Sequence, residues 1–162
     1  MKEKTYKLFW KINEIHRKVY SIEYPKDKEY YEFIEEQHEK GFRQIIVTSE
    51  LMIKLIKKLI IENNININEI LFLDDDKDIQ KDIDYEISHV AKNTKDLTSL
   101  IKTIEFYTKE NNIDIKRICF NGYIKTQKQA IIYIQANGIL GINSESYNII
   151  KTYIANIIES EL

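Results

Sequence analysis

The sequence predicts a single α/β domain built on a mostly parallel, five-stranded sheet with helices on both faces, which is a three-layer arrangement. Two observations lead to this fold class. Short apolar runs rich in β-branched residues alternate with amphipathic helices along the chain. In addition, the stretch from Arg43 to Asn121 contains the same unit twice: a strand, a polar turn, a helix ending on Asn-Asn-Ile, and a second strand. A helix that returns the chain to a neighbouring strand is typical of parallel sheets.

Length and composition fit this fold class. A chain of 162 residues corresponds to about one domain, which we place at 1–162 with an N-terminal arm over 1–24. Hydrophobic residues make up 43% and charged residues 31% of the chain, which excludes a disordered protein. The formal net charge is −2 and the lysines are scattered among acids. A basic surface for nucleic acid is therefore not expected.

The sequence also bears on cellular location. The N-terminal stretch MKEKTYKLFW lacks the apolar core and small-residue cleavage site of a signal peptide, and no apolar run reaches the roughly 18 residues of a membrane span. The single cysteine, Cys119, lies within an apolar strand, where a small buried side chain is the ordinary interpretation. These features predict a cytoplasmic protein without a membrane partner.

The N-terminal half contains an arm, two helices and one strand. Between residues 6 and 22 the apolar residues fit both a strand and a helix, and we favour a strand. A helix is predicted after Asp27, a capping residue, and Gly41 lies just past its end. The apolar run 45–47 then predicts a strand buried on both faces. The next helix begins at Thr48 or Ser49, and its apolar stripe consists of Met52, Leu55, Ile56, Leu59 and Ile60.

The C-terminal half continues the alternation of strands and helices. A long helix is predicted from Asn93 or Thr94 to Tyr107, and the last helix begins near Ser144. The remaining four strands are predicted over 69–73, 85–91, 116–121 and 139–142.

The segment 127–137 has two interpretations. Ala130, Ile131 and Ile134 share a helical face, whereas Ile132, Ile134 and Ala136 alternate as in a β-hairpin. We favour the helix because it preserves the alternation and because Gly138 stands where a helix commonly ends.

The candidate ligand-binding residues follow from this fold class. In an open parallel sheet, ligands bind beyond the carboxyl ends of the strands, near helix N-termini with unsatisfied N–H groups. The alternative is that each of these residues serves as a helix cap or turn. The positions so selected are Thr48, Ser49, Glu50, Asn93, Asn121, Tyr123, Asn143 and Ser144.

An acidic triplet, Asp74 to Asp76, directly follows the predicted strand 69–73. On an extended chain Asp74 and Asp76 project to the same side, so their carboxylates could share Mg²⁺, which prefers oxygen ligands. Mg²⁺ is the one cofactor that the sequence leaves open. The competing interpretation is a solvated loop that caps the next helix.

Other familiar motifs are absent from the sequence. The turn VTSELMIK contains no glycine, so its backbone cannot close around a phosphate as a glycine-rich phosphate loop does. His16, His38 and His89 lack the spacing of paired zinc ligands. The sequence therefore predicts neither ATP hydrolysis nor a zinc site.

Four segments together resemble a RecA/KaiC-like ATPase core that lacks its phosphate loop: VTSELMIKLIKKL, EILFLDDD, NTKDLTSLIKTIEFYTKENNIDIKRICFN and ILGINSESYNIIKTYIANIIE. In that family the residue at the position of Asn121 is usually acidic and positions a metal. The upstream segment HRKVYSIEYPKDKEYYEFIEEQHEKGF resembles the start of the related MEDS-type sensory domains. This resemblance implies a domain that senses small molecules or relays signals without hydrolysing ATP.

A second resemblance is to response-regulator receivers, through ILFLDDDKDI and YEISHVAKNTKDL. Two departures weaken it. The segment between Asp76 and Tyr85 is too short for the first receiver helix, and Asn121 stands where the phosphorylated aspartate would be.

These observations lead to three hypotheses about function. The first is a non-catalytic sensory or regulatory domain that binds a small ligand or a partner protein at the carboxyl edge of the strands. The second is a Mg²⁺-dependent phosphotransfer or hydrolase enzyme that uses Asp74 and Asp76. The third is an inhibitor or immunity-type protein that acts by docking to a partner protein. A homodimer is compatible with each of them.

Overall fold

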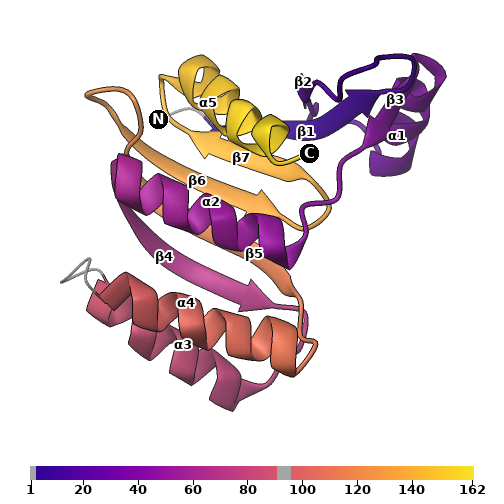
Figure 1. The fold of residues 1–162 in the computed structure, drawn as a ribbon. Helices are drawn as coiled ribbons and strands as arrows, with labels where there is room; N and C mark the ends of the chain where they lie inside the picture. The colour runs from indigo at the N-terminus through magenta and orange to yellow at the C-terminus, as the bar shows by residue number, and fades with distance from the viewer. Residues whose placement is uncertain (1–2, 91–95) are drawn as a thin grey trace.

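The centre of the molecule is an antiparallel sheet of seven strands, seen in a computed structural model that describes residues 3–90 and 96–162 (Figure 1). Every strand pairing among these residues is antiparallel. The strands follow the spatial order β2-β1-β7-β6-β5-β4, and β3 pairs with the end of β1. They are β1 (Glu3–Lys11), β2 (Tyr20–Glu23), β3 (Phe42–Gln44), β4 (Asn64–Phe72), β5 (Ile115–Tyr123), β6 (Gln129–Gln135) and β7 (Ile139–Asn143).

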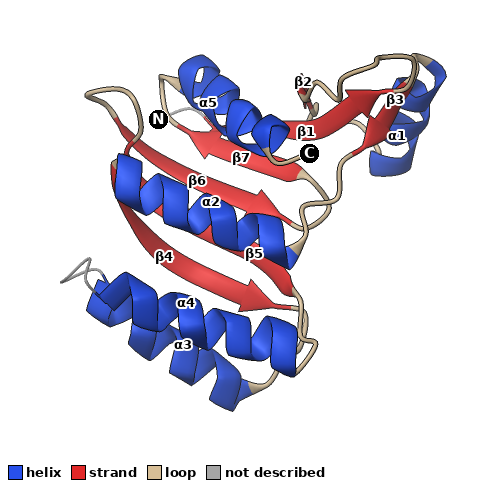
Figure 2. Cartoon of the chain, viewed as in Figure 1, coloured by secondary structure: helices blue, strands red, loops and turns tan. Residues whose placement is uncertain are grey.

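Helices cover one face of this sheet almost completely (Figure 2). They are α2 (Ser49–Glu62), α3 (Lys77–Val90), α4 (Leu97–Glu105) with the π-helical turn η2 (Phe106–Glu110), and α5 (Tyr147–Ser160); α1 (Tyr30–Glu39) lies apart, beside β3. Within the described residues no helix is long and apolar enough to cross a membrane.

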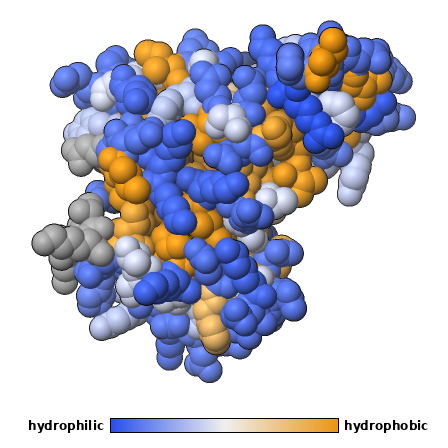
Figure 3. All heavy atoms as spheres, in the orientation of Figure 1, coloured by the Kyte–Doolittle hydropathy of each residue, from blue (hydrophilic) through white to orange (hydrophobic). Residues whose placement is uncertain are grey.

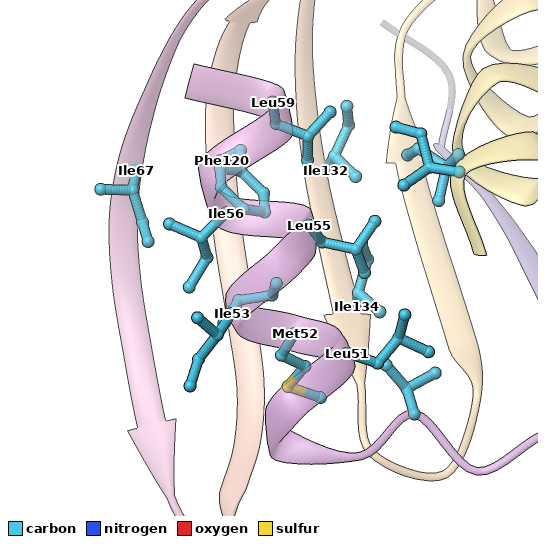
Figure 4. Close-up of a cluster of buried hydrophobic side chains, with 14 of the residues drawn as sticks. Leu51, Met52, Ile53, Leu55, Ile56, Leu59, Ile67, Phe120, Ile132 and Ile134 are labelled. Carbon is cyan, nitrogen blue, oxygen red and sulfur yellow. The ribbon is translucent and has the colours of Figure 1, made fainter. Parts of the chain in front are cut away.

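The core forms where α2 lies across the sheet (Figure 4). The predicted stripe of α2 is correct: Leu55, Ile56 and Leu59 are fully buried. They pack over the side chains that alternate along the strands beneath, such as Phe120 and Ile132. Each aliphatic side chain of this size stabilises the fold by about 1.5–3 kcal/mol when it is removed from water. The helix itself begins where Thr48 accepts a hydrogen bond from the Leu51 amide at 3.2 Å.

The predicted mostly parallel, five-stranded sheet is wrong, because all pairings are antiparallel and two strands come from the N-terminal arm. The predicted helix 127–137 is instead part of a meander of β5, β6 and β7. The helix and hairpin interpretations of this segment predict different roles for Asn137-Gly138, a helix end or a hairpin turn. In the structure these residues form the turn between β6 and β7, and Gly138 adopts a φ of +82°. An Asn-Gly pair between alternating apolar residues is a strong hairpin feature, and it decides in favour of the strand.

Two further predicted strands are wrong. The segment 85–91 belongs to α3 as far as residue 90, because Ile79, Ile83 and Ile87 recur at helical spacing and face the sheet. The segment 45–47 runs alongside the sheet as an extended connection after β3, and Ile46 is 62% exposed instead of buried on both faces.

One face of the sheet is left without helices over most of its width. Side chains alternate along a strand, so Leu8 points to the face that carries α5, whereas Phe9 points to the opposite face. There Phe9 meets Phe33 of α1, with ring centroids 6.1 Å apart. Helix α1 thus covers the opposite face only beside β1 and β3 (Figure 1). The helices α2 and α5 leave the other side of β4 to β7 uncovered.

The edge strand β4 is protected by α3. The Gln80 side chain of α3 donates a hydrogen bond of 3.2 Å to the backbone carbonyl of Ile70. A backbone group satisfied in this way is not free to pair with a strand of another molecule. Association through the sheet is therefore directed to its uncovered face and away from this part of its edge.

Candidate binding face

The predicted site residues Thr48, Ser49 and Glu50 lie at the N-terminus of α2, and two of them have structural roles. Thr48 caps the helix. The Ser49 hydroxyl donates to the Asp114 carboxylate at 3.2 Å and accepts from the Ile115 amide at 2.9 Å. These contacts tie α2 to the start of β5.

The carboxylates of Asp74 and Asp76 are engaged by the backbone at the same end of the sheet. Asp74 accepts from the Asp76 amide at 3.1 Å, and Asp76 accepts from the Asp78 amide at 2.8 Å. These bonds form the turn that starts α3. Among the residues that the structure describes, no group of three His, Cys, Asp or Glu side chains is placed to hold a metal. The Mg²⁺ hypothesis stays a prediction.

The other predicted residues lie elsewhere. Ser144 is buried and accepts a hydrogen bond of 3.1 Å from the Ser146 amide, in the turn before α5. Asn93 lies outside the described residues. The candidates thus fall at opposite ends of the sheet, because antiparallel strands have no common carboxyl edge.

Three predicted residues, Asn121, Tyr123 and Asn143, do share a surface, which is the uncovered side of the sheet. Asn121 on β5 and Asn143 on β7 are both register partners of Ile131 on β6, so the three form one row across the strands. We call this surface the open face. It comprises Asn66, Glu69 and Leu71 of β4; Arg117, Cys119, Asn121 and Tyr123 of β5; Gln129, Ile131, Tyr133 and Gln135 of β6; Ile139, Gly141 and Asn143 of β7; and Glu3 and Thr5 of β1.

The open face is poor in charge compared with the rest of the chain. On β5, β6 and β7, which lie wholly within the described residues, Arg117 is the only charged residue at an open-face position. Its guanidinium is paired with Glu69 of β4 at 3.0 Å. By contrast, the outward sides of the helices are mostly hydrophilic (Figure 3). Depletion of charge together with tyrosine and arginine is typical of the centre of protein interfaces.

The middle of the open face is flattened by a contact between Tyr133 and Gly141. A Cβ atom at Gly141 would lie 2.0 Å from the Tyr133 ring, so only glycine allows the ring to lie across β7. On its other side the ring is 5.8 Å from the Arg117 guanidinium carbon. Neither Tyr133 nor Gly141 was predicted from the sequence. A glycine within a strand, which marks a close approach of another group, was the available indication.

Two side-chain amides of the open face lack hydrogen-bond partners. The Oδ1 atoms of Asn121 and Asn143 are buried and accept no hydrogen bond within the described part of the chain. Between them lies Ile131, which is 39% exposed. Burying an unpaired acceptor costs about 1–3 kcal/mol, but both oxygens are out of reach of an external donor. What this row offers to a partner is the half-buried remainder of the two asparagine side chains and the exposed Ile131.

Lys7 lies on the same side of the sheet, at the border where α1 covers it. Its side chain is fully buried, and its Nζ has no hydrogen-bond partner in residues 3–90 and 96–162. The Nζ atom lies over the Tyr30 ring of α1, 5.9 Å from its centroid. Burial lowers the pKa of Lys7 from 10.5 to about 8.

Two concave places among the described residues lie away from the open face or at its margin. A groove of about 410 Å³ runs between α2 and α4, lined by Ile61, Leu97 and Ile101, and its orange side chains are visible in Figure 3. A hollow of about 400 Å³ beside the β5–β6 turn includes Tyr123 and Lys125. Neither encloses a cluster of groups that suggests a reaction.

Comparisons with known proteins supply no relative: no family model, no curated protein and no solved structure matches this chain. The two family resemblances drawn from the sequence stay predictions.

Proposed function

We propose that this chain acts by binding a partner protein through the open face and that it does not itself catalyse a reaction. The observation that carries the proposal is the row Asn121–Ile131–Asn143 on the helix-free face, in which two half-buried asparagines flank an exposed isoleucine. Asparagine side chains can donate and accept hydrogen bonds at a partner's surface, and the partner's apolar surface would cover the isoleucine.

The chemistry of the open face limits the kind of partner. The Glu69–Arg117 pair neutralises its own charges, so a strongly acidic or basic partner would find no opposite charge there. Exposed Tyr123 and the flat Tyr133 ring offer apolar area with polar tips. The fitting partner is a flat protein surface of low net charge that presents N–H or O–H groups.

Of the three hypotheses raised by the sequence, docking to a partner protein is the one that this geometry favours. A small-ligand site would need several candidate residues to converge on one cavity. Instead, Asn121 and Asn143 point from a flat sheet surface, while Thr48 and Ser49 lie at the far end of the sheet and bond to their own backbone or to Asp114.

Photo-crosslinking tests the proposal. A benzophenone amino acid is placed at the position of Ile131 and, as a matched control, at Ile149, an exposed isoleucine on the helix-covered side. Irradiation in cells that naturally express the protein should yield a discrete protein adduct from the Ile131 position and none from Ile149. Equal adducts from both positions, or no adduct from the Ile131 position, would overturn the proposal.

A further inference from the structure

We infer that the partner bound by the open face is a second copy of this chain, stacked face to face about a two-fold axis that runs along β6. The inference rests on the proposed function of the open face. Five strands carry that face: β4, β5, β6, β7 and the N-terminal part of β1. Strand β6 is the central one, so an axis along it superposes the whole face on itself.

Hydrogen-bonding groups are self-complementary under this rotation. Asn121 and Asn143 lie one strand, about 4.8 Å, on either side of Ile131. Rotation about β6 exchanges the two sides, so each Asn121 faces the partner's Asn143. An amide carries both an acceptor and donors, so each pair can form a hydrogen bond across the interface when one amide rotates to bring its oxygen to the surface. Packed sheets lie about 10 Å apart, a gap that two asparagine side chains span.

The apolar and charged side chains of the open face are also compatible with the side chains that they meet on a second copy. Ile131 and Tyr133 lie on the axis and meet the same residues of the second molecule. Glu69 shares a row with Thr5, two strands from β6 on the other side, and the rotation places these two opposite each other. Extending the β6–β7 register by one residue pairs Gln135, the partner of Arg117, with Ile139. The rotation therefore places Arg117 over Ile139 of the second molecule. Glu3, in the row of Ile131, comes to face Asn66. Among these residues of the open face no like charges meet, which a symmetric interface requires because each surface faces itself.

The size of the face predicts how strong the dimer is. Five strands by seven residues give a flat footprint of about 550 Å² per copy, or about 1,100 Å² for two. This value lies near the lower limit for specific interfaces and above that of most crystal contacts. A dimer that dissociates on dilution is therefore expected.

Sedimentation equilibrium of the purified chain tests the inference. The wild-type protein should show a reversible monomer–dimer equilibrium. Ile131→Arg should raise its dissociation constant about tenfold or more, whereas the control Ile149→Arg should leave it unchanged. Circular dichroism melting establishes that each variant is folded.

A charge-reversal experiment makes self-recognition explicit. One variant carries Asn121→Asp with Asn143→Asp, and another carries Asn121→Lys with Asn143→Lys. Each alone should be monomeric because like charges face each other, and an equimolar mixture should form a dimer.

The outcomes separate the two proposals. A wild-type chain that is monomeric at every concentration, or a mixture that stays monomeric, overturns the second-copy inference. If the Ile131 photo-adduct then contains a different protein, the proposed function stands. If it contains the mass of two copies of this chain, both stand.

Discussion

The substitution Lys7→Met tests whether the buried Lys7 amine destabilises the fold. Lys7 is fully buried, its Nζ has no hydrogen-bond partner among the described residues, and burial lowers its pKa from 10.5 to about 8. Near neutral pH the amine is mostly protonated, so the folded state carries a buried charge. A shift of this size corresponds to about 3 kcal/mol of lost stability. Methionine retains the unbranched, flexible chain without the charge.

The free energy of unfolding should depend on pH, because Lys7 has a lower pKa in the folded chain than in the unfolded chain. Between about pH 8 and about pH 10.5 the unfolded chain keeps a proton on Lys7 that the folded chain has released. The contribution of Lys7 to the stability of the wild-type protein should therefore rise with pH in this window. Lys7→Met should be more stable than wild type by up to about 3 kcal/mol near pH 7, and this gain should shrink as the pH rises above about 8.

Urea unfolding followed by circular dichroism from about pH 7 to about pH 10 measures both effects. The upper limit matters because the pKa values of Tyr6 and Tyr107 are raised to about 12, so their contributions to stability are lost above about pH 10. Lys11→Met, at an exposed position of the same strand, is the control and should change little. Cys119, whose pKa is raised by burial, lowers stability at the alkaline end in both proteins, so the difference between them is the measure. A gain from Lys7→Met that stays constant from about pH 7 to about pH 10, or a Lys7→Met variant that is destabilised near pH 7, would refute the reasoning.

The remaining predictions concern the core, the acidic turn and the open face. Leu55→Ala should destabilise the protein by about 2–5 kcal/mol in urea unfolding, because it leaves a cavity under α2; a loss below about 1 kcal/mol would contradict the packing. Asp76→Ala should lower the free energy of unfolding by about 1 kcal/mol, because the start of α3 loses its cap. This loss should be the same with and without Mg²⁺, and a difference between the two conditions would instead support a metal site. Gly141→Ala should displace the Tyr133 ring and weaken the dimer in sedimentation equilibrium while the protein stays folded; unchanged dimerisation would show that a flat ring is not needed.

The sequence was most informative where local pattern decides the structure. The helices α2 and α5 were predicted because their apolar residues recur at helical spacing, and both bury those residues against the sheet. The strands β5 and β7 were predicted from short apolar runs bounded by polar residues. The alternation along β6 was visible too, but the rhythm of strands and helices was given more weight than the Asn137-Gly138 turn.

Strand direction could not be predicted in the same way. A strand, a helix and a second strand suggest a parallel pair, yet the strands that flank α2 are not neighbours: β3 pairs with β1, and β4 pairs with β5. Such pairings join residues far apart in the sequence and leave no local pattern.

The candidate site depended on strand direction and was predicted only in part. Asn121, Tyr123 and Asn143 were selected as strand-end residues, and they share a surface for a different reason: they occupy alternate positions on neighbouring antiparallel strands. Gly141 and Tyr133 were missed because their contact crosses from β6 to β7. Identifying it requires the register of the two strands.

Cys119 is the only cysteine in the chain and lies within the open face, so its alkylation reports directly on whether that face is covered. Burial raises the pKa of its thiol, and the reaction is therefore followed at mildly alkaline pH. We predict that the alkylation rate constant falls as the concentration of wild-type protein rises, and that Ile131→Arg removes this protection. A rate constant that is independent of wild-type concentration would contradict the central claim that the open face binds a second copy.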